Sequence, residues 1–191
     1  PFLETFAFFK DKPIHAGLEG YLFPDTYRLY TSTPAQDVAI KMLENFDVKF
    51  SDDLRKETIS QHRTIHEIII MASLIEKEAV LETDRELISG ILWKRLTLGI
   101  PLQVDATLIF LTGRKTTKVL YADTAIDSPY NTYKYKGLPK GPIANPGLSA
   151  IRAALYPKKS PYLYYLSTSE GRIIFSRTLE EHNVAKAKYL Q

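Results

Sequence analysis

The stretch from Thr64 to Ala79 constrains the fold of this chain more than any other part of the sequence. Apolar residues there recur at i, i+3, i+4 and i+7, which is the spacing of one helical face. They are Ile65, Ile68, Ile69, Ala72, Ile75 and Ala79. Thr64 and Glu67 match the T-x-x-E capping box just before this run. The sequence therefore predicts a helix that begins after Thr64 and is buried along one stripe.

One carboxylate, Glu76, lies inside this apolar stripe. A carboxylate in such a place must be paired, protonated or directed into a cleft. The small neighbours Ala72 and Ser73 leave room beside it, which suits an approaching substrate. Lys77 and Glu78 project from other faces of the predicted helix and are expected to be ordinary solvated charges. Glu76 is thus a candidate catalytic residue, and a buried ion pair is the alternative.

The rest of the chain predicts an α+β fold in which helices predominate. Capping patterns and amphipathic spacing predict helices, and two apolar runs joined by a short turn predict a β-hairpin. The expected helices are 34–46, 51–62, 84–98 with a cap at Thr83 and Glu86, 151–155, and a terminal helix capped by Thr178 and Glu181; the hairpin strands are 162–167 and 172–176. Gly99 and Pro101 are expected to end the helix before them.

The composition fits a soluble, globular chain with one main domain. Its 191 residues are 45% hydrophobic, enough for a sizeable core. No apolar run approaches the roughly 18 residues of a membrane-spanning helix. The net charge of +3 is too small to imply polyanion binding, and the absence of cysteine excludes disulfides. Because the chain starts at Pro1, we expect it to be a fragment, with any anchor or export signal upstream.

A proline- and glycine-rich loop, 128–147, interrupts the regular elements. Its sequence, SPYNTYKYKGLPKGPIANPG, carries tyrosines every few positions, unlike a disordered segment. Aromatic faces pack on sugar rings, and amide and hydroxyl groups bond sugar hydroxyls. Tyr130, Asn131 and Thr132 are therefore candidate sugar-binding residues. A loop whose prolines and tyrosines only pack onto the core fits the same sequence.

Five separate stretches resemble the endolytic murein transglycosylases, the YceG-like or MltG proteins, and occur in that family's order. They are LEGYLFPDTY (18–27), ASLIEKE (72–78), LQVDATLIF (102–110), the 128–147 loop and FSRTLEEHN (175–183). One departure is Ala106, where the family usually has proline. The resemblance implies a catalytic domain over 18–191, with 1–17 as the remnant of a linker from a missing LysM-like region.

The resemblance implies cleavage of the bond between N-acetylmuramic acid and N-acetylglucosamine in peptidoglycan, with formation of a 1,6-anhydro ring. It implies that Glu76 is the catalytic acid and base, and that no cofactor or metal is needed. It also implies peptidoglycan strands as substrate, peptidoglycan synthases as partners, and a single N-terminal anchor that holds the catalytic domain on the outer side of the bacterial cell membrane.

Further residues are expected to contact the substrate. Glu19 precedes Gly20 in a segment that the resemblance places in the cleft, where it would orient substrate or tune Glu76. Gln103, Asp105 and Thr107 alternate, so they would share one face of an extended segment. Loop-capping hydrogen bonds are the alternative role for Glu19.

Other functions are less consistent with the sequence. His62 and His66 have metal-ligand spacing, but the expected helix cap Thr64 separates them. The small net charge argues against a nucleic-acid platform in the lysine- and tyrosine-rich loop. Two alternatives stay open. One is a non-catalytic peptidoglycan-binding module. The other is a pyridoxal-phosphate aminodeoxychorismate lyase, as this family has sometimes been labelled, for which no Schiff-base lysine can be nominated.

Overall fold

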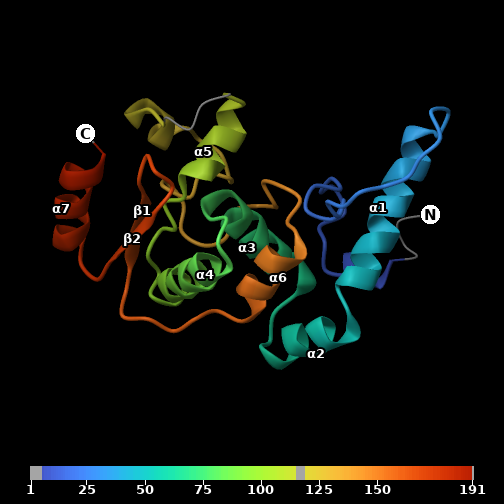
Figure 1. The fold of residues 1–191 in the computed structure, drawn as a ribbon, viewed down its shortest axis with the longest axis horizontal. Helices are drawn as coiled ribbons and strands as arrows, with labels where there is room; N and C mark the ends of the chain where they lie inside the picture. Colours follow the sequence, from blue (N-terminus) through green and yellow to red (C-terminus); the bar gives the residue numbers. More distant parts are fainter. Residues whose placement is uncertain (1–5, 115–118, 191) are drawn as a thin grey trace.

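The computed structural model describes residues 6–114 and 119–190 and has a helical centre with a β-hairpin at one end (Figure 1). The helices are α1 (Ala35–Lys49), α2 (Asp52–Ser60), α3 (Ile65–Glu78), α4 (Glu82–Thr97), α5 (Asp105–Thr112), α6 (Leu148–Leu155) and α7 (Leu179–Tyr189), with 3-10 turns η2 (Ala7–Phe9) and η3 (Tyr121–Ala125). Strands β1 (Tyr164–Ser167) and β2 (Ile173–Ser176) pair antiparallel. The predicted α+β class is confirmed.

Helix α3 lies at the centre of the fold, and its predicted start is confirmed. The Thr64 hydroxyl accepts a hydrogen bond from the Glu67 amide at 3.1 Å, and the Glu67 carboxylate accepts one from the Thr64 amide at 2.8 Å. Every residue of 68–75 is buried. Helices α4 and α6 pack on α3, and Figure 1 shows it between them. Because α3 is enclosed on all sides, its environment is not divided into one apolar stripe and a solvated remainder.

Most other predicted elements are confirmed, with two corrections. The Thr178 hydroxyl caps α7 by accepting a hydrogen bond from the Glu181 amide at 3.1 Å, as expected. The cap predicted at Thr83 is wrong, because α4 already begins at Glu82 and its N-cap residue makes no side-chain hydrogen bond. The extended segment expected through Thr107 is also wrong. Helix α5 begins at Asp105, so Gln103 and Thr107 do not share an extended face.

The described residues before α1, from Phe6 onward, contribute to the same core as the helices. Phe8, Tyr21 and Phe46 are buried together, with the Phe8 and Phe46 rings 4.7 Å apart between centroids. The Tyr21 hydroxyl and His66 Nδ1 lie 2.8 Å apart and link this cluster to α3. His66 is thus occupied in the core, and His62 lies outside α3. The origin of residues 1–17 as a linker stays a prediction.

The 128–147 loop has no helix or strand, as predicted, and is bound along α3 by polar side chains. The Ser73 hydroxyl accepts a hydrogen bond from the Ile143 amide at 3.1 Å. The Asn145 carbonyl oxygen accepts one from the Gly20 amide at 2.7 Å. Gly20 has φ of +90°, and a Cβ there would come within 2.5 Å of Pro142. Only glycine lets the 18–22 segment approach the loop so closely.

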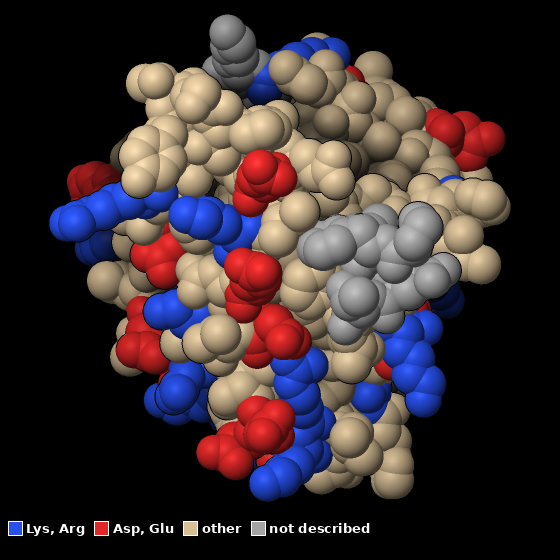
Figure 2. Space-filling view, turned by 90° about the vertical axis from the view of Figure 1, so that its right-hand side faces the viewer, with Lys and Arg blue, Asp and Glu red and all other residues tan. Residues whose placement is uncertain are grey.

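The described residues contain no helix long and apolar enough to span a membrane. On the face at the α1 end of the molecule, acidic and basic side chains are interspersed (Figure 2). The two signs therefore offset each other on that face, and no broad field of one sign covers it.

Candidate active-site groove

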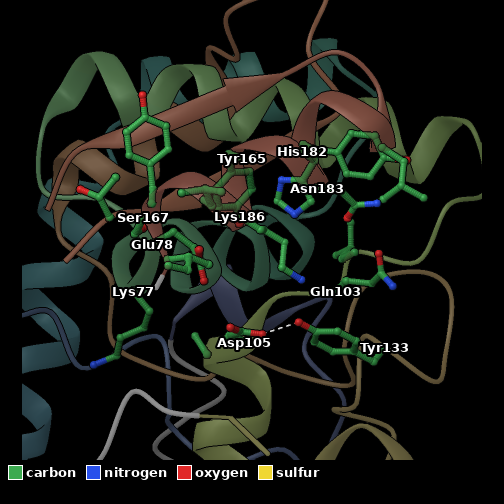
Figure 3. Close-up of a pocket in the computed structure, with 18 of the residues that line it drawn as sticks. Lys77, Glu78, Gln103, Asp105, Tyr133, Tyr165, Ser167, His182, Asn183 and Lys186 are labelled. Carbon is green, nitrogen blue, oxygen red and sulfur yellow. Dashed lines mark hydrogen bonds between the residues drawn. The ribbon is translucent and has the colours of Figure 1, made fainter. Parts of the chain in front are cut away.

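A groove of about 1100 Å³ runs between the end of α3, the start of α5, the hairpin and α7. Figure 3 shows Glu78, Asp105, Tyr133 and Tyr165 around it, from four different parts of the chain. This volume lies just above the range of roughly 300–1,000 Å³ typical of small-molecule pockets, so it suits an oligomeric ligand. A smaller hollow of about 200 Å³ shares Lys77, Glu78 and Ser167 with the groove. Glu78 thus lies where the two cavities meet.

Glu78 is the last residue of α3, and its side chain is directed into the groove. Ala79 follows in an extended conformation and turns the chain away toward α4. The expectation that Glu78 is an ordinary solvated charge is wrong, because the hairpin and the start of α5 cover the end of α3 and leave this residue only partly exposed.

The environment of Glu78 favours its protonated form. Burial raises the pKa of the Glu78 carboxyl to about 7, and the negative charge of Asp105 acts in the same direction. A hydrogen bond from Tyr165 acts in the opposite direction but does not cancel the burial. In turn, burial and the Glu78 charge hold the pKa of Tyr165 well above its usual range. Tyr165 therefore stays a neutral donor, and Glu78 can hold a proton near neutral pH.

The segment before α5 presents Gln103 and Asp105 to the groove, and Thr132 fixes that segment. The Gln103 amide donates to the Thr132 carbonyl at 3.0 Å, and the Val104 amide donates to the Thr132 hydroxyl at 3.0 Å. The Thr107 hydroxyl lies 3.1 Å from that of Thr132. Gln103 has φ of +53°, a left-handed conformation that costs a non-glycine residue energy. The loop therefore holds this segment in the shape that brings Asp105 close to Glu78.

Two further side chains hold the walls of the groove together. The Tyr133 hydroxyl donates a hydrogen bond to Asp105 (Figure 3). The buried Arg95 donates to the Pro101 carbonyl at 2.7 Å, to Gln103 Oε1 at 2.6 Å and to the Leu163 carbonyl at 3.3 Å. Arg95 thereby joins α4, the segment before α5 and the start of the hairpin.

Glu76 lies on another side of α3, where it is fully engaged with the protein. Glu76 Oε1 accepts a hydrogen bond from Arg85 at 2.9 Å, and Oε2 accepts one from the Gly147 amide at 3.0 Å. Arg85 also donates to the Ala79 carbonyl at 2.8 Å. The Glu76 side chain is 27% exposed and borders the smaller hollow. This geometry ties the end of α3 to α4 and to the N-cap residue of α6, and matches the ion pair considered as the alternative.

The structure brings only part of the predicted substrate-binding set to the groove. Gln103 and Asp105 line it, whereas Thr107 and Thr132 are buried beside it in the contacts that shape its wall. Asn131 is buried, and both ends of its amide are bonded to backbone groups of the loop and of the segment just before it. Its nitrogen donates to the carbonyls of residues 124 and 126, and its oxygen accepts from the amides of residues 133 and 134.

The remaining two candidates lie outside both cavities. Tyr130 packs against Phe110, with 5.1 Å between the ring centroids. Burial raises the pKa of Tyr130, and the nearby negative charge of Glu19 adds to the effect. Glu19 is exposed. The predicted contact of these two residues with substrate stays a prediction.

Several groove residues were not singled out from the sequence. Tyr165 and Tyr164 read as ordinary strand residues, and His182 and Asn183 as part of the terminal helix. Only the FSRTLEEHN stretch gave a signal for the last two. The described residues contain no cluster of three or more His, Cys, Asp or Glu side chains that would hold a metal ion.

The family model for the YceG-like family matches residues 4–188. The chain belongs to the YceG-like family. A crystal structure of a YceG-like protein from Listeria monocytogenes superposes with a TM-score of 0.85 at 43% identity, covering 92% of this chain and 58% of that one.

Similar family members carry the name endolytic murein transglycosylase. The Bacillus subtilis protein is 44% identical over 184 residues, which are 94% of this chain and 50% of that protein. The Streptococcus pneumoniae R6 protein is 38% identical over 186 residues, which are 93% of this chain and 33% of that protein. This YceG-like chain thus spans half or less of the length of these relatives.

Proposed function

We propose that this chain is the catalytic part of a lytic transglycosylase that cleaves the muramic acid–glucosamine bond of peptidoglycan strands. The observation that carries the proposal is the partly buried Glu78 at the meeting point of two cavities, one of them large enough for several sugars. The name of the similar family members supports the substrate class. An open groove with a carboxyl in its wall fits cleavage within a strand.

We propose Glu78, rather than Glu76, as the acid and base. A general acid must be protonated and must reach the reacting bond; the raised pKa of Glu78 and its place in the groove wall support this role. Glu76 instead pairs with Arg85 and accepts a hydrogen bond from the Gly147 amide, so a proton on it would remove the charge that holds Arg85. The catalytic role expected for Glu76 from the sequence is therefore proposed for Glu78, two residues later on α3.

The reaction follows from one carboxyl used twice. Glu78 first donates its proton to the glycosidic oxygen while the bond from that oxygen to C1 of muramic acid breaks. As a carboxylate it then accepts the proton of the C6 hydroxyl of the same sugar, whose oxygen bonds to C1 and closes the anhydro ring. The 2-acetamido group can stabilise the positive charge at C1, as in glycosidases that lack a carboxylate nucleophile. The negative charge of Asp105, which lines the groove near Glu78, also stabilises the positive charge at C1.

The anhydro end is the product that separates this mechanism from hydrolysis. Uncrosslinked glycan strands would be digested with this chain and their new ends weighed before and after borohydride reduction. We expect ends that are one water lighter than hydrolysed ends and are unchanged by borohydride, because they have no reducing aldehyde. Water-added, reducible muramic ends would identify a hydrolase. Binding of strands without any new ends would identify the non-catalytic module.

We further propose that the whole protein works on the outer side of the bacterial cell membrane, held there by a single anchor and next to peptidoglycan synthases. The location of the substrate supports the first point, and the family resemblance supports the others. Fractionation of cells that produce the full-length protein tests the location, and recovery in the cytoplasm would contradict it.

A further inference from the structure

Helix α7 forms the outer wall of the groove and carries polar groups that the proposed reaction does not use. It packs on β1 and β2. His182 and Lys186 are four residues apart, so they lie on the same face of the helix, and both line the groove together with Asn183. Figure 3 shows these three residues on one side of the cavity, with Gln103 and Asp105 on the other.

Lys186 brings an uncompensated positive charge to this wall. Its side chain extends into the groove, and its ammonium makes no hydrogen bond or ion pair with any residue of 6–114 or 119–190. The neighbouring cation Arg95 is different, because carbonyl oxygens and Gln103 occupy its guanidinium. Lys186 is therefore available to an anion that enters the groove.

His182 adds an unsatisfied polar atom beside Lys186. Its ring stacks on Tyr164 with 5.4 Å between the centroids, and the buried Nδ1 has no hydrogen-bond partner in the described part of the chain. Burial lowers the pKa of His182, and the positive charges of Lys186 and Arg95 lower it further. The imidazole is thus neutral at pH 7 and can donate or accept a hydrogen bond, while Lys186 supplies the charge.

The opposite wall carries a negative charge at Asp105. Asp105 is exposed there and accepts a hydrogen bond from the Tyr133 hydroxyl. Glu78 lies near Asp105 at the end of α3, and Lys77 precedes Glu78 and lines both the groove and the smaller hollow. An anionic group on the ligand is repelled from the Asp105 side and attracted to the Lys186 side. The difference in charge between the walls therefore fixes which side of a bound strand faces α7.

We propose that His182, Asn183 and Lys186 form a subsite for a carboxylate carried by the substituent at C3 of alternate sugars in the strand. The subsite rests on the proposed function, because it assigns a part of the same groove. In peptidoglycan that substituent is a lactyl ether, which ends in its own carboxylate or in a peptide that bears carboxylates. Both sources present the same chemistry to a lysine, an amide and a neutral imidazole.

Binding measurements on the non-cleaving Glu78→Gln chain test the subsite. The ligands are peptide-bearing strands, strands stripped of peptide, and N-acetylglucosamine oligomers of the same length, which have no C3 substituent. Two double variants are compared, one that combines Glu78→Gln with Lys186→Ala and one that combines it with Lys188→Ala. Lys188 is the control because it is on the same helix but lies over the Tyr189 ring and outside the groove. We expect Lys186→Ala to raise Kd for at least one muramyl ligand by about 5- to 10-fold, and less at high salt. Kd for the glucosamine oligomers should not change.

Each outcome bears on the subsite. A Lys186-dependent Kd for peptide-bearing strands alone assigns the carboxylate to the peptide, and for stripped strands alone assigns it to the lactyl group. Equal Kd values for the Lys186→Ala and Lys188→Ala chains on every ligand overturn the subsite and leave the proposed function standing. An equal loss on glucosamine oligomers also overturns it, because Lys186 then contacts the sugar itself. Failure of all strands to bind overturns both proposals.

Discussion

Glu78→Gln is expected to lower the rate of strand cleavage by at least about 100-fold, the low end of the effect of general acid–base catalysis. Glutamine keeps the size and helix propensity of the side chain but cannot give up and regain a proton. Because Glu78 is the last residue of α3 and its side chain lines the groove, the fold should be preserved. The rate is measured from the release of new strand ends, with the melting temperature as a check on folding.

Glu76→Gln is the matched variant, with the same chemical change two residues earlier on α3. Its amide oxygen can still accept the Gly147 hydrogen bond, but the charge that holds Arg85 is lost. We expect a fall in melting temperature and a loss of rate below about tenfold. A loss of that size is typical of a slightly displaced catalytic group, whereas removal of the general acid costs far more. The reverse pattern, an inactive Glu76→Gln chain of normal stability and an active Glu78→Gln chain, would return the acid role to Glu76.

The helix predicted over 64–79 is confirmed, but its spacing does not indicate which of Glu76 and Glu78 lines the groove. A periodic pattern assigns faces relative to one apolar side, and α3 is instead surrounded by α4, α6 and the 128–147 loop. The element that encloses Glu78 is the hairpin, about ninety residues later in the chain. Its position over the end of α3 depends on tertiary packing, which no local spacing in the sequence reveals.

The tyrosine-rich loop shows the same limit for individual side chains. Its irregular structure was predictable from its prolines and glycines. The role of Asn131 was not, because the carbonyl groups that its amide binds reach it only through the turn η3 and the bend after it. Helix α5 was missed because it has eight residues, is apolar on most sides and lacks a side-chain cap. Helices α3 and α7, by contrast, begin at the threonine caps that the sequence predicts.

The stability of the chain should fall as pH rises through the interval in which Glu78 ionises. The ordinary pKa of the carboxyl is 4.5, and burial raises it to about 7 in the folded chain. Between these values the folded state holds more protons than the unfolded state, so this contribution to stability is complete below pH 4.5 and is lost as pH rises through 7. At 1.36 kcal/mol per unit, the loss amounts to about 3 kcal/mol at most, and solvent access to the groove reduces it.

Glu78→Gln isolates this contribution, because glutamine does not titrate while every other group is unchanged. We expect the variant to gain stability relative to the parent chain as pH rises from 4.5 to 8, measured by guanidinium chloride unfolding at several pH values. Glu44→Gln, which removes an exposed carboxyl on α1, controls for the loss of one charge and should show no such trend. A constant difference between the Glu78→Gln and parent chains across this range would mean that Glu78 ionises in the groove as easily as in the unfolded chain. Glu78 would then be a carboxylate at neutral pH, and its role as the proton donor would lose its physical basis.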